Sequence, residues 1–136
     1  EGAYETLRPY YADLDALPQT ERDFLAARVV ARVWDEPQRL AALSIQKASL
    51  PYFLTAGRRL ARRISSLGMP ALVVWGERDA IFPIANARPR AEAQPGARLA
   101  ILPGVGHLPQ QERPHLLLET LLPFLDGALV PEGKSR

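Results

Sequence analysis

The sequence predicts an α/β fold in which two parallel strands are flanked by helices and preceded by a helical region. Residues 71–75 and 99–102 are short, continuous apolar runs, each ended by a turn with glycine, as is typical of buried parallel strands. One helix-sized segment separates them, which predicts a right-handed strand-helix-strand unit. Residues 1–68 instead favour helices, so we place a boundary there and assign the strands to residues 69–136.

The first helical segments follow from apolar spacing. Residues 1–19 show little periodicity and predict an irregular lead-in with one short helical turn near residues 10–17. Residues 21–34 carry apolar side chains on one broad stripe and predict a helix. Thr20 followed by Asp23 resembles a capping box with a shortened acid, so we expect Thr20 to cap this helix.

Two more helices are expected before the first strand. Asp35 is placed to cap the second helix, whose apolar residues again share one face. The third should begin after Pro51 and run to about Leu67, where Gly68 should end it.

The strand-containing part is completed by two further helices. Residues 84–94 should form the crossover helix, regular from about Ala87, because the proline two positions later is tolerated only in a first turn. Pro114 should open a final helix that is apolar on most of its circumference. We expect Pro123 to kink or end it and residues 127–136 to form a loosely held tail.

Each predicted strand leads into a turn with one candidate catalytic side chain. These side chains are Asp79 and His107. Parallel pairing places both turns at the same sheet edge, where active sites of open α/β sheets lie. A histidine acting as a general base needs a partner that fixes its tautomer, and a carboxylate supplies this. Gly104 and Gly106 give the backbone around His107 freedom to turn.

Two segments carry a resemblance to a known family. WGERDAIFP resembles the acid loop of α/β-hydrolases and PGVGHLPQQERP resembles their histidine loop, in the family's order. The resemblance covers about the second half of the chain. It implies the C-terminal part of an α/β-hydrolase sheet, with its last two parallel strands, and the acid and base roles for Asp79 and His107.

The family's nucleophile elbow is not found in these 136 residues. The esterase-like pattern G-x-S-x-G precedes the acid and the histidine in the family, and no serine here has both glycines or follows a strand-like run. The serines concerned are Ser44, Ser49, Ser65, Ser66 and Ser135. We therefore expect an N-terminal part of the same hydrolase to supply the nucleophile, the oxyanion-hole donors and the remaining strands.

The resemblance places a helical cap in residues 1–68, before the acid strand. Five apolar residues there are candidates for a substrate pocket, although each one alone is more typical of packing between helices. They are Trp34, Leu50, Tyr52, Phe53 and Leu54. The expected function is esterase-like hydrolysis of a small-molecule substrate without cofactor or metal. An aspartate nucleophile, as in dehalogenase-like or epoxide-hydrolase-like relatives, and a non-catalytic binding role both stay open as alternatives.

Composition and charge limit the partners and the cellular location that we expect. A formal net charge of +2 does not indicate nucleic acid or an acidic membrane surface as a partner. Without cysteine there is neither a disulfide framework nor a thiolate, which fits the cytoplasmic location we expect. No apolar run approaches a membrane span. The basic residues Arg58, Arg59, Arg62 and Arg63 predict a solvated helix face more readily than an anion site.

Overall fold

The computed structural model describes residues 2–55, 63, 66 and 68–129, without the side chains of residues 50–55, 128 and 129. Strand β1 (Leu72–Gly76) pairs in parallel with β2 (Arg98–Leu102), with Leu72 opposite Arg98 and Gly76 opposite Leu102. The 3-10 turn η3 (Ile84–Asn86) and helix α5 (Ala87–Glu92) connect them. The predicted α/β class and the strand-helix-strand unit are confirmed.

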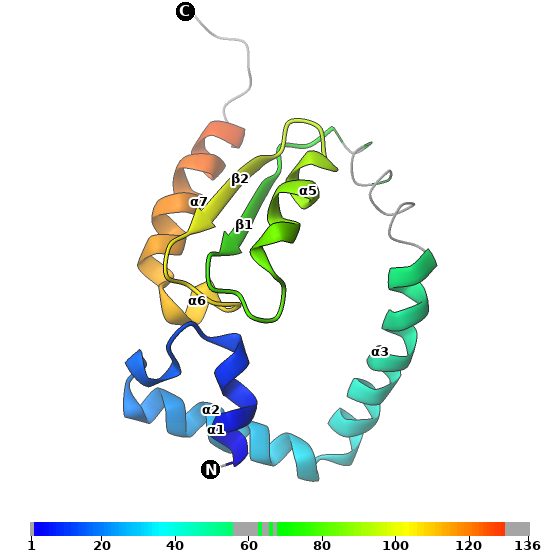
Figure 1. Ribbon diagram of the computed structural model, residues 1–136, viewed down its shortest axis with the longest axis vertical. Helices are drawn as coiled ribbons and strands as arrows, with labels where there is room; N and C mark the ends of the chain where they lie inside the picture. Colours follow the sequence, from blue (N-terminus) through cyan, green and yellow to red (C-terminus); the bar gives the residue numbers. More distant parts are fainter. Residues whose placement is uncertain (1, 56–62, 64–65, 67, 130–136) are drawn as a thin grey trace, which may run out of the picture.

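Two helices flank the strands, α5 on one side and α7 (Pro114–Leu129) on the other (Figure 1). The short helix α6 (Pro109–Glu112) lies between β2 and α7. Helix α7 begins at Pro114 as predicted, but it continues through Pro123 to Leu129. The expected end at Pro123 and the expected tail at residues 127–129 are therefore wrong, and the rest of that tail lies outside the described residues. A proline removes one helical hydrogen bond, and the strong helix formers on both sides of it offset that loss.

Residues 2–17 are more ordered than the sequence predicted. They form α1 (Gly2–Leu7) and the 3-10 turns η1 (Arg8–Tyr10) and η2 (Leu14–Ala16). Tyr11, Leu14 and Leu17 make a buried apolar cluster with exposed fractions of 5%, 3% and 8%. Short 3-10 turns lack the 3.6-residue period, so this packed segment looked irregular in the sequence.

Helix α2 spans Gln19–Trp34, which confirms the helix predicted for residues 21–34. The predicted cap is wrong, because the N-cap residue is Pro18 and Thr20 already lies inside the first turn. The backbone N–H groups of Glu21 and Arg22 donate to the Pro18 carbonyl at 3.0 and 3.1 Å. The extended backbone of Pro18 starts the helix two residues earlier than the capping motif indicated.

Helix α3 spans Glu36–Thr55. Asp35 caps it as predicted, since its Oδ1 accepts the backbone N–H of Gln38 at 3.1 Å. The helix continues past Pro51, so the predicted start of a separate helix there is wrong. Most of that expected helix, including the arginines at 58, 59 and 62, lies outside the described residues. Gly68 has φ +64°, the left-handed conformation expected of a helix-ending glycine.

Helices α2 and α3 form an arc that lies apart from the sheet (Figure 1). Their large apolar side chains are widely exposed: Phe24, Val30, Val33, Trp34, Leu40, Leu43 and Ile45. Within the described ranges, every helix is too short or too polar to traverse a lipid bilayer.

Candidate active site

The turns after β1 and β2 are joined to each other by backbone hydrogen bonds. The N–H of Glu77 donates to the Leu102 carbonyl at 3.0 Å, and that of Arg78 donates to the Val105 carbonyl at 2.8 Å. The Glu77 carboxylate accepts the N–H of Gly104 at 2.8 Å. Val105 is completely buried beneath these contacts. The two loops therefore form one unit at the C-terminal edge of the strands, as the parallel arrangement predicted.

Asp79 and His107 meet within this unit. The Asp79 Oδ2 atom lies 2.9 Å from Nδ1 of His107. Its other oxygen, Oδ1, accepts the backbone N–H groups of Ile81 and Phe82, each at 2.8 Å. The Asp79 side chain is 7% exposed, whereas that of His107 is 25% exposed. Both oxygens of the carboxylate thus have a hydrogen-bond partner, and the imidazole stays partly exposed.

The environment of Asp79 favours its ionised form. Burial alone would raise the pKa of this carboxyl, but the hydrogen bond with His107 and the backbone N–H groups of Phe82 and Ile81 act in the opposite direction. Together these bonds outweigh burial and bring the pKa below its usual value. The carboxylate is therefore charged at neutral pH and can accept the Nδ1 hydrogen of His107.

Two aromatic rings hold the imidazole of His107. The ring of Phe82 lies 5.3 Å away in an edge-on arrangement, and that of Tyr10 lies 5.9 Å away. The backbone N–H of His107 also donates to the Tyr10 carbonyl at 2.9 Å. With Nδ1 directed at Asp79, Nε2 is the nitrogen left to exchange a proton with another group.

Glycines permit the close approach of these segments. A Cβ on Gly76 would overlap the carbonyl oxygens of Val105 and Gly106, so the end of β1 can lie directly under the histidine loop. Gly106 needs space in the same way, because its Cβ would lie 2.5 Å from the backbone N of Ala12. Gly104 has φ +65°, which confirms the predicted need for a turning glycine at that position.

Glu112 ties the histidine loop to the N-terminal segment. Its Oε2 accepts the N–H of Gly106 at 2.6 Å, and its Oε1 accepts the N–H groups of Ala12 and Asp13 at 2.6 and 3.4 Å. One carboxylate thereby joins two backbone segments that lie about a hundred residues apart in the chain. The sequence analysis missed this residue.

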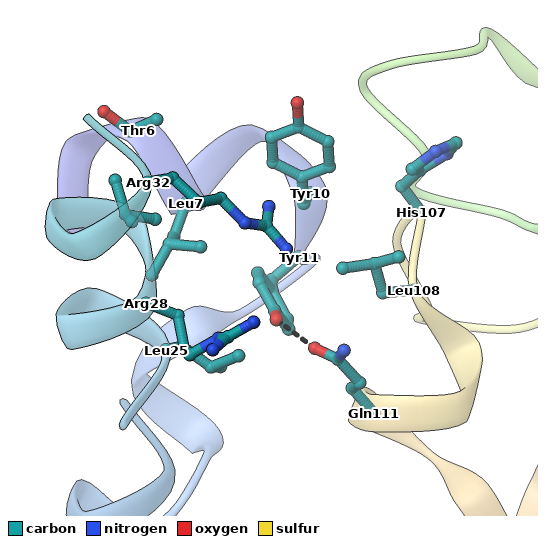
Figure 2. A pocket seen from close by; sticks show the side chains of 11 residues that line it. Thr6, Leu7, Tyr10, Tyr11, Leu25, Arg28, Arg32, His107, Leu108 and Gln111 are labelled. Atoms are coloured by element: carbon teal, nitrogen blue, oxygen red, sulfur yellow. Dashed lines mark hydrogen bonds between the residues drawn. The ribbon is translucent and has the colours of Figure 1, made fainter. Parts of the chain in front are cut away.

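A second tether lies beside the first. The hydroxyl of Tyr11 donates to Oε1 of Gln111 (Figure 2). Burial, followed by the negative charges of Glu112 and Glu21, raises the pKa of Tyr11, which keeps this hydroxyl protonated. The available sequence signal was weak: a pair of tyrosines in a segment without periodicity.

His107 lines two cavities. The larger, of about 470 Å³, lies between His107 and helices α1 and α2 (Figure 2). The smaller, of about 230 Å³, lies beside Asp79, Phe82 and the end of β1. A substrate in either cavity would lie next to the imidazole.

Of the five residues predicted for a substrate pocket, only Trp34 has its side chain among the described residues. Trp34 ends α2, is 83% exposed and belongs to neither lining. Leu50, Tyr52, Phe53 and Leu54 lie on α3, and their side chains are outside the described residues. The larger cavity is lined instead by Tyr10, Tyr11, Leu7, Leu25 and Leu108, together with the polar groups considered below.

Comparison with known proteins decides the family. The sequence profile described as "Alpha/beta hydrolase family" matches residues 2–120. The chain belongs to the alpha/beta hydrolase family. Carboxylesterase YbfK of Bacillus subtilis strain 168 is 30% identical over 107 residues, which make up 77% of this chain and 34% of YbfK. The predicted family is therefore confirmed.

Two solved structures share the fold of this chain. A bacterial membrane phospholipase A superposes with a TM-score of 0.71 at 20% identity, covering 93% of this chain and 37% of that one. A putative lipase from Acinetobacter baumannii AYE gives a TM-score of 0.70, also at 20% identity, covering 93% and 41%. The chain thus spans well under half the length of these relatives.

Proposed function

We propose that the complete enzyme cleaves a small carboxylic ester through a nucleophile-His107-Asp79 triad. The observation that carries this proposal is the bond between His107 Nδ1 and a buried, ionised Asp79 at the edge where parallel strands end. The partial identity with a carboxylesterase supports the same reaction class.

Each residue has a defined task in this proposal. His107 Nε2 takes the proton of the nucleophile as it attacks the ester carbonyl, and then gives that proton to the departing alcohol. Water then attacks the acyl-enzyme and loses a proton to Nε2, and Nε2 returns that proton to the nucleophile as the acyl bond breaks and the carboxylic acid leaves. Asp79 holds the Nδ1 tautomer and stabilises the imidazolium that forms in both steps.

We propose further that the N-terminal part of the same hydrolase supplies the nucleophile and covers apolar surface of this chain. Large apolar side chains are exposed on the sheet and on one helix beside it: Ile101 on β2 and Leu118, Leu122 and Leu125 on α7. Strands buried on both faces need helices and further strands around them, so such surface is typical of a part of a larger core. On this proposal residues 1–136 alone are inactive.

The test uses the complete enzyme and p-nitrophenyl acetate. His107→Ala should remove nearly all turnover while the melting temperature stays close to that of the wild type, because the imidazole is a partly exposed group at the sheet edge. His115→Ala is the matched control, since this exposed histidine on α7 lines neither cavity beside His107. Turnover that survives in His107→Ala would refute the triad.

The nucleophile is located by a second measurement. A serine-directed fluorophosphonate should label one serine of the complete enzyme, and mass spectrometry should find it outside residues 1–136. Label on Ser44 or Ser49 would contradict the proposal. Absence of label together with an ester-linked intermediate on an aspartate would show the dehalogenase-like or epoxide-hydrolase-like chemistry instead.

A further inference from the structure

The larger cavity beside His107 combines an apolar wall with two positive charges. Leu7, Leu25, Val29 and Leu108 supply the wall, while Arg28 and Arg32 extend into the same lining from α2. Figure 2 shows both arginine side chains on the α2 side of the cavity, across from His107 and Gln111. A ligand in this space would meet an apolar surface, two guanidinium groups and the imidazole at once.

The charges of Arg28 and Arg32 are not neutralised locally. Within the described ranges neither guanidinium forms an ion pair, whereas Arg22 on the same helix pairs with Asp15 at 2.6 Å. No aspartate or glutamate is among the described residues that line the cavity. Arg28 and Arg32 are four residues apart, so they lie on one helix face and repel each other. An anion bound between them removes that repulsion.

Guanidinium chemistry specifies the kind of anion. Arginine presents planar, paired N–H donors that match the oxygens of a carboxylate or a phosphate. The chain carries a formal net charge of only +2, so this positive cavity is a local feature and not part of a basic surface field. The neighbouring leucine and valine side chains favour an apolar segment between the anion and the reacting ester.

We propose that this cavity selects an ester that carries a carboxylate or phosphate group separated from the ester bond by an apolar segment. Arg28 and Arg32 bind the oxyanion, the leucine-rich wall contacts the apolar segment, and the ester carbonyl lies beside His107. This inference rests on the proposed hydrolase function, since it names the substrate class of the same site.

The test measures competitive inhibition of p-nitrophenyl acetate hydrolysis by the complete enzyme. The probes are hexanoate, hexyl phosphate and uncharged hexan-1-ol, which share one chain length. The anionic probe that fits should bind roughly 10-fold more tightly than hexan-1-ol, the gain typical of charge-assisted hydrogen bonds. Its advantage should shrink as salt is added, because partly exposed charges are screened. The preferred anion distinguishes a carboxylate substrate from a phosphate one.

Variants of the arginines decide the assignment. The double variant Arg28→Gln, Arg32→Gln should lose the preference for the anion while its affinity for hexan-1-ol stays the same. Arg28→Lys with Arg32→Lys should keep part of the preference, since the charge remains. Arg90→Gln is the matched control, because Arg90 is exposed on α5 and outside the cavity. An unchanged anion preference in the double glutamine variant would overturn the inference.

Failure of the hydrolase proposal can be distinguished from failure of the anion-site proposal. If the complete enzyme does not hydrolyse p-nitrophenyl acetate, the triad proposal fails, and the same probes and variants are then compared by isothermal titration calorimetry. Binding of hexanoate or hexyl phosphate that depends on Arg28 and Arg32 would support the anion site by itself. Equal binding of the anions and hexan-1-ol to the wild type would refute it.

Discussion

The loops after the strands and the helices α2 and α3 are held in place by different kinds of contact. In the loops, carboxylates bind partners far away in the chain: Asp79 contacts His107, Glu77 contacts Gly104, and Glu112 contacts Ala12. The bonds of α3 are local, as in the Asp35 cap, and large apolar side chains remain exposed on both helices. The geometry around His107 is thus fixed by this chain itself, while the helices present surface for something else to contact.

The largest effect on the loop region is expected from the substitution Asp79→Asn. The amide cannot carry the charge that stabilises imidazolium, and its NH₂ group can force the wrong tautomer on His107. We expect kcat of the complete enzyme to fall by up to about 10⁴-fold. Asp126→Asn, an exposed change on α7, should leave kcat unaltered. Equal activity of the two variants would show that the bond between Asp79 and His107 has no catalytic role.

The sequence predicted this pair because its signals are local. Two apolar runs, a helix-sized crossover and a polar residue after each run suffice to bring Asp79 and His107 to one sheet edge. Glu112 gave no such signal. Its partners at residues 12, 13 and 106 are backbone N–H groups, which every residue but proline carries, so nothing in the sequence distinguishes the ones that bind it.

A smaller effect is expected from Glu112→Gln. The substitution replaces one acceptor oxygen by an NH₂ group, so either Gly106 or Ala12 loses the acceptor for its backbone N–H. We expect the free energy of unfolding to fall by about 1–3 kcal/mol, with kcat reduced because the histidine loop is less firmly held. Chemical denaturation of the complete enzyme measures the change in the free energy of unfolding. Glu119→Gln is the control, because Glu119 is exposed on α7. Matching curves for the two variants would mean that the tether contributes nothing.

The charge of Asp79 should also appear in the pH dependence of stability. Its pKa is lowered in the folded protein from the usual 3.8, so below that value the unfolded chain binds more protons than the folded one. The stabilisation is complete above the unfolded pKa and is lost as pH falls through the folded pKa. We expect the stability difference between wild type and Asp79→Asn to be constant near neutral pH and to shrink in acid. A constant difference throughout would contradict the lowered pKa.

The helical region shows why the sequence alone does not locate the residues that line a cavity. Large aromatic and aliphatic side chains such as Trp34 were chosen because they are apolar, but apolarity does not say which way a helix faces. The larger cavity beside His107 is lined in part by Tyr10 and Tyr11, which come from the segment that looked irregular. Their positions depend on 3-10 turns and on tethers to the histidine loop, which are tertiary contacts without a periodic pattern.

The two tryptophans of the chain allow the stability of the strand region to be compared with that of helix α2. Trp75, on β1, donates from Nε1 to the Phe82 carbonyl at 3.0 Å, and Phe82 in turn contacts His107. Trp75→Ala should lower the free energy of unfolding by about 2 kcal/mol, the scale of a substantially buried aromatic side chain. Trp34 is 83% exposed, so Trp34→Ala should change it by less than about 0.5 kcal/mol. Thermal and chemical unfolding of the complete enzyme compare the two variants directly.

The same pair of variants tests the pocket predicted from the sequence. If Trp34 contacts substrate, its removal should raise KM. A stability loss in Trp34→Ala as large as that in Trp75→Ala would show that the rest of the enzyme covers α2. Helix α2 would then be buried in the complete enzyme, and its exposure would be a property of residues 1–136 alone.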